Sequence, residues 1–119
     1  MAVDLYRVEW VTEGVRKTIR GFPIGVRREI GLALRMAQQG LMADFAKPLK
    51  GFRGAKVIEI VADDDGDTYR AVYAIQMGDA IWVLHAFQKK SKHGKETPQK
   101  EIELIRERLR RAQLLSNLD

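Results

Sequence analysis

The chain contains no cysteine, and only 2 of its 119 residues are histidine. No disulfide can therefore staple the fold, and no thiol is available for catalysis or metal binding. The two histidines lack the paired spacing of a zinc site, so no metal and no other cofactor is expected. The chain also lacks an apolar run long enough to span a bilayer, and its opening segment, MAVDLYRVEW, lacks the basic-then-apolar order of a secretory signal. These absences favour a cytoplasmic protein without membrane contact.

Motifs that usually mark catalysis or phosphate binding are missing as well. There is no Gly-rich phosphate loop and no Gly-x-Ser-x-Gly nucleophile elbow. The stretch DDDGD at residues 63–67 resembles the start of a calcium-binding loop, but its glycine is fourth instead of sixth and no glutamate stands at the twelfth position. It is better interpreted as a hairpin turn.

Positive charge is what the sequence has in excess. The net charge is +5 and the pI is about 9.7, which favours nucleic acid, an acidic protein face or another anionic surface as partner. Four lysines lie within seven residues, namely Lys89, Lys90, Lys92 and Lys95, and no acidic residue stands among them. Such a cluster of one sign at a strand end is typical of phosphate contact. An ordinary solvated loop is the alternative interpretation.

Hydrophobic periodicity divides the chain into strand-like and helical segments. Alternating apolar residues predict strands over residues 5–11, 56–62, 68–77 and 80–87. Helical spacing predicts helices over residues 13–20, 23–39 and 98 to about 112, with Thr12 and Thr97 as N-caps. The buried stripes are expected to be Val26, Ile30, Ala33, Leu34 and Ala37 in the second helix and Ile102, Ile105, Leu109 and Ala112 in the last.

This order predicts an α+β fold in a single domain over residues 1–119. An N-terminal strand, two helices, a three-stranded antiparallel run and a C-terminal helix would form one sheet with the helices on one face, the last of them near an edge. The opposite face is expected to be partly open.

Arg70 is a candidate for that open face. On strand alternation it points away from Tyr73 and Ile75, which mark the core side. An arginine there can hold a phosphate in planar, bidentate geometry. An edge ion pair with Asp67 or Glu59 is the alternative.

The two histidines differ in their surroundings. On strand alternation His85 shares a face with Ile81, Val83 and Phe87, and it is expected to be a hydrogen-bonded core residue. His93 lies in the lysine-rich loop, where neighbouring positive charge would lower its pKa and suit it to proton transfer. An inert exposed histidine is the alternative there.

Three stretches, KPLKGFRGAKVIEI, GDTYRAVYAI and IWVLHAFQKKSKHGKETPQKEIELIRERLRRA, resemble the RelE/ParE toxin superfamily, above all its phage-derived HigB-like branch. The resemblance covers residues 5–112 and is most specific from residue 69 to residue 102. It implies a RelE-like fold and the toxin of a type II toxin–antitoxin system, which acts as a ribosome-dependent mRNA endonuclease. It also implies a toxin–antitoxin hetero-oligomer with a helix-turn-helix antitoxin, with the ribosome and mRNA as further partners.

The resemblance also implies roles for particular residues. Arg70 matches the family arginine that contacts the scissile phosphate, and Lys89 and Lys90 match basic positions after the last strand. With His93 they form the candidate catalytic set, while the candidate RNA-binding residues are Lys56, Lys92 and Lys95.

Two departures from the family pattern leave the proton donor and acceptor open. Glu59 stands where RelE-like toxins tend to carry a basic residue, and no tyrosine follows Lys95. Metal-independent cleavage by the ribose 2′-OH needs a base, an acid and cations at the phosphate, and here His93, His85, Glu59 or a lysine are the candidates for the first two. A ParE-like gyrase poison and a catalytically silent RNA-binding phage module are the alternative functions.

Overall fold

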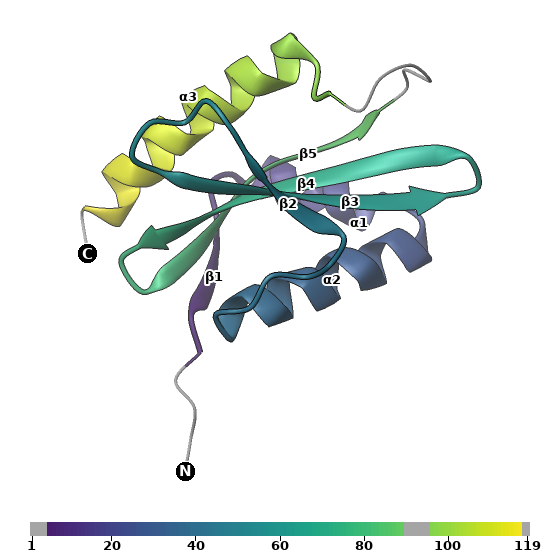
Figure 1. The fold of residues 1–119 in the computed structure, drawn as a ribbon, viewed down its shortest axis with the longest axis horizontal. Coiled ribbons are helices and arrows are strands. Elements are labelled where there is room, and N and C mark those ends of the chain that lie inside the picture. The colour runs from purple at the N-terminus through teal and green to yellow at the C-terminus, as the bar shows by residue number, and fades with distance from the viewer. Residues whose placement is uncertain (1–4, 90–95, 118–119) are drawn as a thin grey trace.

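The computed structural model describes residues 5–89 and 96–117, which form a five-stranded mixed sheet and three helices. The elements are β1 (Arg7–Trp10), α1 (Glu13–Arg20), α2 (Ile24–Gln38), β2 (Ala46–Leu49), β3 (Lys56–Asp64), β4 (Asp67–Met77), β5 (Ala80–Lys89) and α3 (Gln99–Ser116). The strand order is β1-β5-β4-β3-β2, in which β1 runs parallel to β5 and all other neighbours are antiparallel (Figure 1). The α+β class and the predicted elements are confirmed, and β2 is a strand that the sequence did not predict.

Local chemistry explains where several elements begin and turn. The Thr12 hydroxyl accepts a hydrogen bond from the Val15 amide and so caps α1 as predicted. The β3–β4 hairpin turns through Asp65 and Gly66, whose φ angles of 51° and 83° fit the type I′ turn favoured by Asp-Gly. The interpretation of DDDGD as a hairpin turn is therefore confirmed.

One face of the sheet packs against α2. Figure 1 shows α2 on one side of the strands and α3 on the other. The buried residues of α2 are those of the predicted stripe, Val26, Ile30, Ala33, Leu34 and Ala37. Ile58, Ile60 and Tyr73 belong to this α2 face, because paired residues of antiparallel strands point to the same side. No helix among the described residues is long and apolar enough to cross a membrane.

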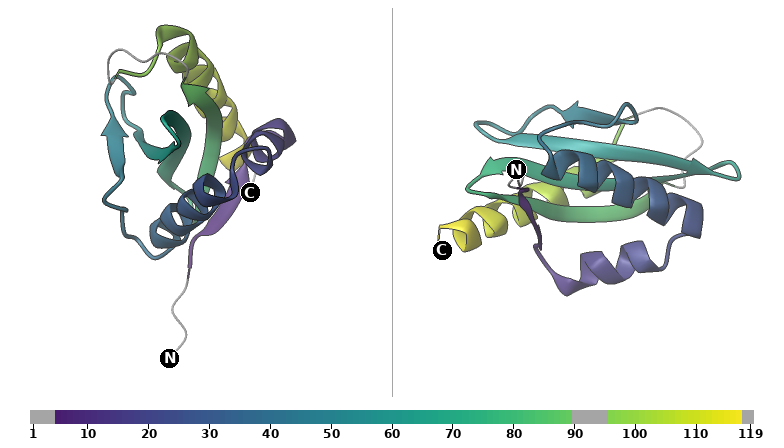
Figure 2. Two further views of the ribbon diagram at one scale, coloured as in Figure 1. Left: turned by 90° about the vertical axis from the view of Figure 1, so that its right-hand side faces the viewer. Right: turned by 90° about the horizontal axis from the view of Figure 1, so that it is seen from below.

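The opposite face, here called the α3 face, is covered by the C-terminal helix. Seen from below in Figure 2, α2 lies in front of the strands and α3 behind them. The predicted stripe of α3 packs against β4 and β5, with Ile105 and Ala112 fully inaccessible, Leu109 6 % exposed and Ile102 partly buried. The expectation that the helices share one face is thus wrong, because the apolar stripe of α3 needs a surface and the second face of the sheet supplies it.

A β-bulge in β5 changes which face His85 points to. Tyr73 pairs with Val83, but Val72 pairs with His85, so Leu84 is the extra residue. His85 therefore lies on the α3 face, opposite to Val83, and simple alternation assigned it to the wrong side.

The packing of α3 can be tested by truncating one buried residue. Replacing Ile105 with alanine is expected to lower the free energy of unfolding by about 2–5 kcal/mol, because the site is sealed between helix and sheet. Leu114→Ala, at a side chain that is 65 % exposed, should change it by no more than about 0.5 kcal/mol. Urea denaturation measures both, and equal effects would mean that α3 lies loosely at an edge.

Candidate functional site

Four ionisable side chains are buried on the α3 face. The exposed fractions are 0 % for Glu59, 4 % for Arg70, 6 % for His85 and 7 % for Lys89. They come from β3, β4 and β5, and the strand register places them on the same side of the sheet. Buried charges are costly unless paired, so their partners determine what this face can do.

The first group, here called the charge cluster, consists of Glu59, Arg70, Lys89 and Thr97. Arg70 Nη1 donates to Glu59 Oε1 at 2.8 Å and lies 3.3 Å from Thr97 Oγ1. The Thr97 hydroxyl in turn donates to Glu59 Oε2 at 2.7 Å. Both carboxylate oxygens are thus satisfied, one by β4 and one by the segment that leads into α3.

Thr97 was predicted to cap α3, and this prediction is wrong by one residue. The N-cap position belongs to Pro98, which makes no side-chain capping bond. The hydroxyl of Thr97 instead donates to the carboxylate of Glu59 in the charge cluster. Hydrogen bonds to an ionised group are stronger than those between neutral groups.

Lys89 extends the cluster along β5. Its ammonium group donates to the Glu96 carbonyl at 2.8 Å. Burial lowers the pKa of Lys89, and the positive charge of Arg70 lowers it further, while Glu59 acts in the opposite direction. A lysine in this setting gives up its proton more readily than one in water.

Arg70 is therefore a buried ion-pair partner. Its direction away from Tyr73 is as predicted, but the open surface is absent because Thr97 and α3 cover it. The alternative of an ion pair with Glu59 is the one that the structure shows, in the interior and not at an edge.

Removing Arg70 should destabilise the protein. Arg70→Ala is expected to lower the free energy of unfolding by about 3–5 kcal/mol, because Glu59 would remain buried without its hydrogen-bonded cation and with Lys47 only at 4.0 Å. Replacing Glu59 with leucine and Arg70 with methionine together should recover most of that loss, since no charge is then left unpaired. Urea denaturation of both variants measures this, and an unchanged midpoint for Arg70→Ala would contradict a buried pair.

The second group ties α3 to the bulge of β5. His85 Nδ1 lies 2.6 Å from Arg108 Nη1, and His85 Nε2 lies 2.9 Å from Glu101 Oε2. A guanidinium can only donate, so Nδ1 accepts and the proton sits on Nε2, which donates to Glu101. Arg108 also donates to the Leu84 carbonyl at 3.2 Å. The prediction of a hydrogen-bonded buried histidine is confirmed.

The neutral state of His85 predicts a pH dependence. Burial lowers the pKa of His85, against the opposing effect of Glu101, whereas a histidine in the unfolded chain titrates near about 6.5. Below that pH the unfolded chain binds a proton that the folded protein resists. Neutral His85 therefore makes its full contribution to the free energy of unfolding above about pH 6.5, and this contribution is lost as the pH falls towards the folded pKa of His85.

Substitution of each histidine separates this effect from other titrations. His85→Gln keeps one donor and one acceptor but cannot titrate, so it should flatten the dependence of stability on pH between about 5 and 7. His93→Gln is the matched control, because these are the only two histidines in the sequence. Denaturation midpoints across this range measure the slope, and an unchanged slope for His85→Gln would rule out the assignment.

The remaining predicted residues fall into two sets. Lys56 is exposed and pairs with Ile75. The residue of β3 that pairs with Arg70 is Val61, five positions further along the strand. At about 3.3 Å per residue this is roughly 17 Å, so Lys56 does not join the charge cluster. The other four, Lys90, Lys92, His93 and Lys95, lie outside the described residues, and their roles stay predictions. Within the described ranges no three His, Asp or Glu side chains are grouped to hold a metal.

A feature that the sequence did not reveal is a groove between α3 and the turn after β2. Its cavity of about 360 Å³, here called the basic groove, is lined by Gly51, Phe52, Arg53, Arg106, Leu109, Arg110 and Gln113. The spacing of Arg106 and Arg110 does place them on one face of α3, but only the fold brings the turn across to meet them.

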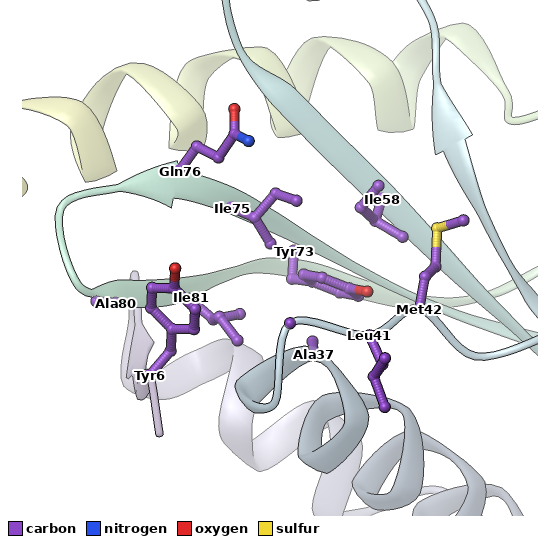
Figure 3. Close-up of a pocket in the computed structure, with 11 residues that line it drawn as sticks. Tyr6, Ala37, Leu41, Met42, Ile58, Tyr73, Ile75, Gln76, Ala80 and Ile81 are labelled. Carbon is purple, nitrogen blue, oxygen red and sulfur yellow. The ribbon is translucent and has the colours of Figure 1, made fainter. Parts of the chain in front are cut away.

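A second cavity, of about 230 Å³, lies on the α2 face. Figure 3 shows Tyr73 and Ile58 of the sheet facing the end of α2, with Tyr6, Leu41 and Met42 around them. None of the described residues that line it is charged. This cavity is apolar and separate from both the charge cluster and the basic groove.

The architecture is that of a small basic α+β protein whose sheet carries a buried cluster of charges under a C-terminal helix. Residues 17–110 match the family of phage-derived, Gp49-like proteins (DUF891). The chain belongs to this Gp49-like family, which is RelE-like and toxin-like in character. A comparison with curated proteins gave no significant match.

Proposed function

We propose that this chain is the toxin of a type II toxin–antitoxin pair, that it belongs to the HigB-like branch with a RelE-like fold, and that it cleaves mRNA on the ribosome. The observation that carries the proposal is the charge cluster, in which Arg70 pairs with the buried carboxylate of Glu59 and the charges of both act on Lys89. Membership of the Gp49-like family supports the same class of protein. The partners would be mRNA, the ribosome and a helix-turn-helix antitoxin encoded beside the gene.

In this proposal Glu59 holds the place of a substrate phosphate. A guanidinium binds carboxylate and phosphate oxygens with the same planar donor geometry. Glu59 keeps Arg70 neutralised in the free protein, at 2.8 Å. RNA would have to displace Glu96 and Thr97, which close the cluster, before its phosphate meets Arg70.

The roles in cleavage then follow from the environments. Arg70 would stabilise the charge that builds on the phosphoryl oxygens. Lys89, whose pKa is lowered by burial, would transfer a proton, with His93 as the other candidate. His85 is an unsuitable acid or base in this conformation, because Glu101 and Arg108 occupy its two ring nitrogens.

A pair of conservative variants tests the site. Arg70→Lys keeps a positive charge beside Glu59 but loses the planar contact, so cleavage should fall about 100-fold, or about 3 kcal/mol of transition-state stabilisation. Glu59→Gln keeps the shape and removes the competing charge, so cleavage should be retained or increased. The measurement is mRNA cleavage in a translating extract, with urea denaturation as the control for folding.

Other outcomes decide between this proposal and its alternatives. Wild-type cleavage by Arg70→Lys would exclude Arg70 from the chemistry, and loss of cleavage in a folded Glu59→Gln protein would make Glu59 the base. Growth arrest with gyrase-dependent DNA breaks and intact mRNA would indicate a ParE-like poison. RNA binding without growth arrest, at confirmed expression, would indicate a silent phage module.

A further inference from the structure

The basic groove gathers three guanidinium groups, and their environments differ. Arg106 is held in place, because its Nη2 donates to the Gly51 carbonyl at 3.3 Å and its guanidinium lies 5.4 Å from the centre of the Phe52 ring. Arg53 and Arg110 are exposed, and neither has an ion pair or hydrogen bond with any described residue. The groove thus has one fixed cation and two that are available to a ligand.

The shape of the turn after β2 is set by glycine. Gly51 and Gly54 have φ angles of 98° and 67°, in the left-handed region that other residues rarely adopt. Between them the chain buries Phe52, which is 8 % exposed, and turns Arg53 outward. The groove is therefore a defined concavity and not a chance meeting of flexible side chains.

The chemistry of the lining selects the class of ligand. Its two large apolar side chains, Phe52 and Leu109, are 8 % and 6 % exposed and so are not available as anchors for a protein partner. What the groove offers is guanidinium, which binds phosphate oxygens and stacks on bases. An oxyanion polymer fits these properties better than an acidic protein, which needs apolar contacts as well.

We infer that the basic groove is a binding site for the phosphate backbone of single-stranded RNA, separate from the charge cluster, with Arg53 and Arg110 as direct phosphate contacts and Arg106 as the fixed centre. This inference rests on the proposed function for the identity of the RNA. Arg106 and Arg110 lie about 10 and 17 Å along α3 from Gln99 at 1.5 Å per residue. A single RNA strand that contacts both the groove and the charge cluster would have to span a distance of this order along α3.

The test compares two charge-matched double variants of the full chain. Arg53→Gln/Arg110→Gln removes the two unpaired groove cations, and Arg27→Gln/Arg28→Gln removes two exposed arginines of α2, on the other side of the sheet. The probe is a fluorescently labelled, ten-nucleotide single-stranded RNA, with its affinity measured from low to physiological salt. The groove variant should reduce the slope of log affinity against log salt by about 1.4, at roughly 0.7 per lost phosphate contact. The α2 variant should leave the slope unchanged.

Each outcome bears on one claim. Equal salt slopes for the wild type and the groove variant overturn the groove site. If the groove variant with an equal slope also loses antitoxin binding, the groove is a protein interface instead. A reduced slope in a protein that cleaves no mRNA upholds the groove site and overturns the proposed function. Urea denaturation of both variants shows whether the fold is intact, and folding should be unaffected because neither Arg53 nor Arg110 has an ion pair or hydrogen bond with another described residue.

Discussion

The buried ion pair between Arg70 and Glu59 is the interaction on which the rest of the sheet's second face depends. A guanidinium and a carboxylate taken out of water cost several kcal/mol each in solvation, and only close geometry and further hydrogen bonds offset that loss. The pair has both, at 2.8 Å between the charged groups and with the Thr97 hydroxyl on the second carboxylate oxygen. Since Thr97 directly precedes Pro98 and α3, satisfying Glu59 also fixes where the C-terminal helix begins.

The position of α3 is then maintained by a second set of polar contacts further along the helix. His85 donates to Glu101 and accepts from Arg108, and Arg108 also donates to the carbonyl of Leu84 at the bulge. The apolar stripe of Ile105 and its neighbours supplies burial energy, which is not directional, whereas these hydrogen bonds determine register. The helix is therefore located by polar groups and stabilised by apolar ones, and the charge cluster is closed as a consequence.

Periodicity in the sequence was enough to predict the three helices and four of the five strands, but not how they face one another. Alternation placed Arg70 opposite Tyr73 correctly, yet burial depends on what covers a face, which is a tertiary property. The bulge at Leu84 has no local signature, so His85 was assigned to the wrong side. β2 escaped because it is only four residues long and contains Pro48, which is tolerated here since the strand lies at the edge of the sheet.

The site shows the same division. The family resemblance implied that Arg70 and Lys89 act together, and in the structure both lie in the charge cluster, where the charge of Arg70 lowers the pKa of Lys89. The sequence could not predict the basic groove, because Arg53 is more than fifty residues from Arg106 and their meeting depends on how the turn after β2 crosses α3. The stripe of α3 indicated a buried helix, and only the buried charges of the sheet determine which surface it covers.

The arginines of the basic groove and the cations of the charge cluster differ in exposure, and this difference determines how each would act on an anionic partner. Exposed arginines in the groove act through water and over about a Debye length, so they increase the rate of encounter and weaken with salt. Arg70 and Lys89 are instead buried, with Arg70 paired to Glu59 and Lys89 hydrogen-bonded to the Glu96 carbonyl. The proposed function and the inferred groove site therefore assign attraction at a distance and recognition at the cluster to different residues. In the proposed function, a partner that reaches the cluster must supply an oxyanion that can replace Glu59, and this requirement would make the closed cluster more selective among anions than the open groove.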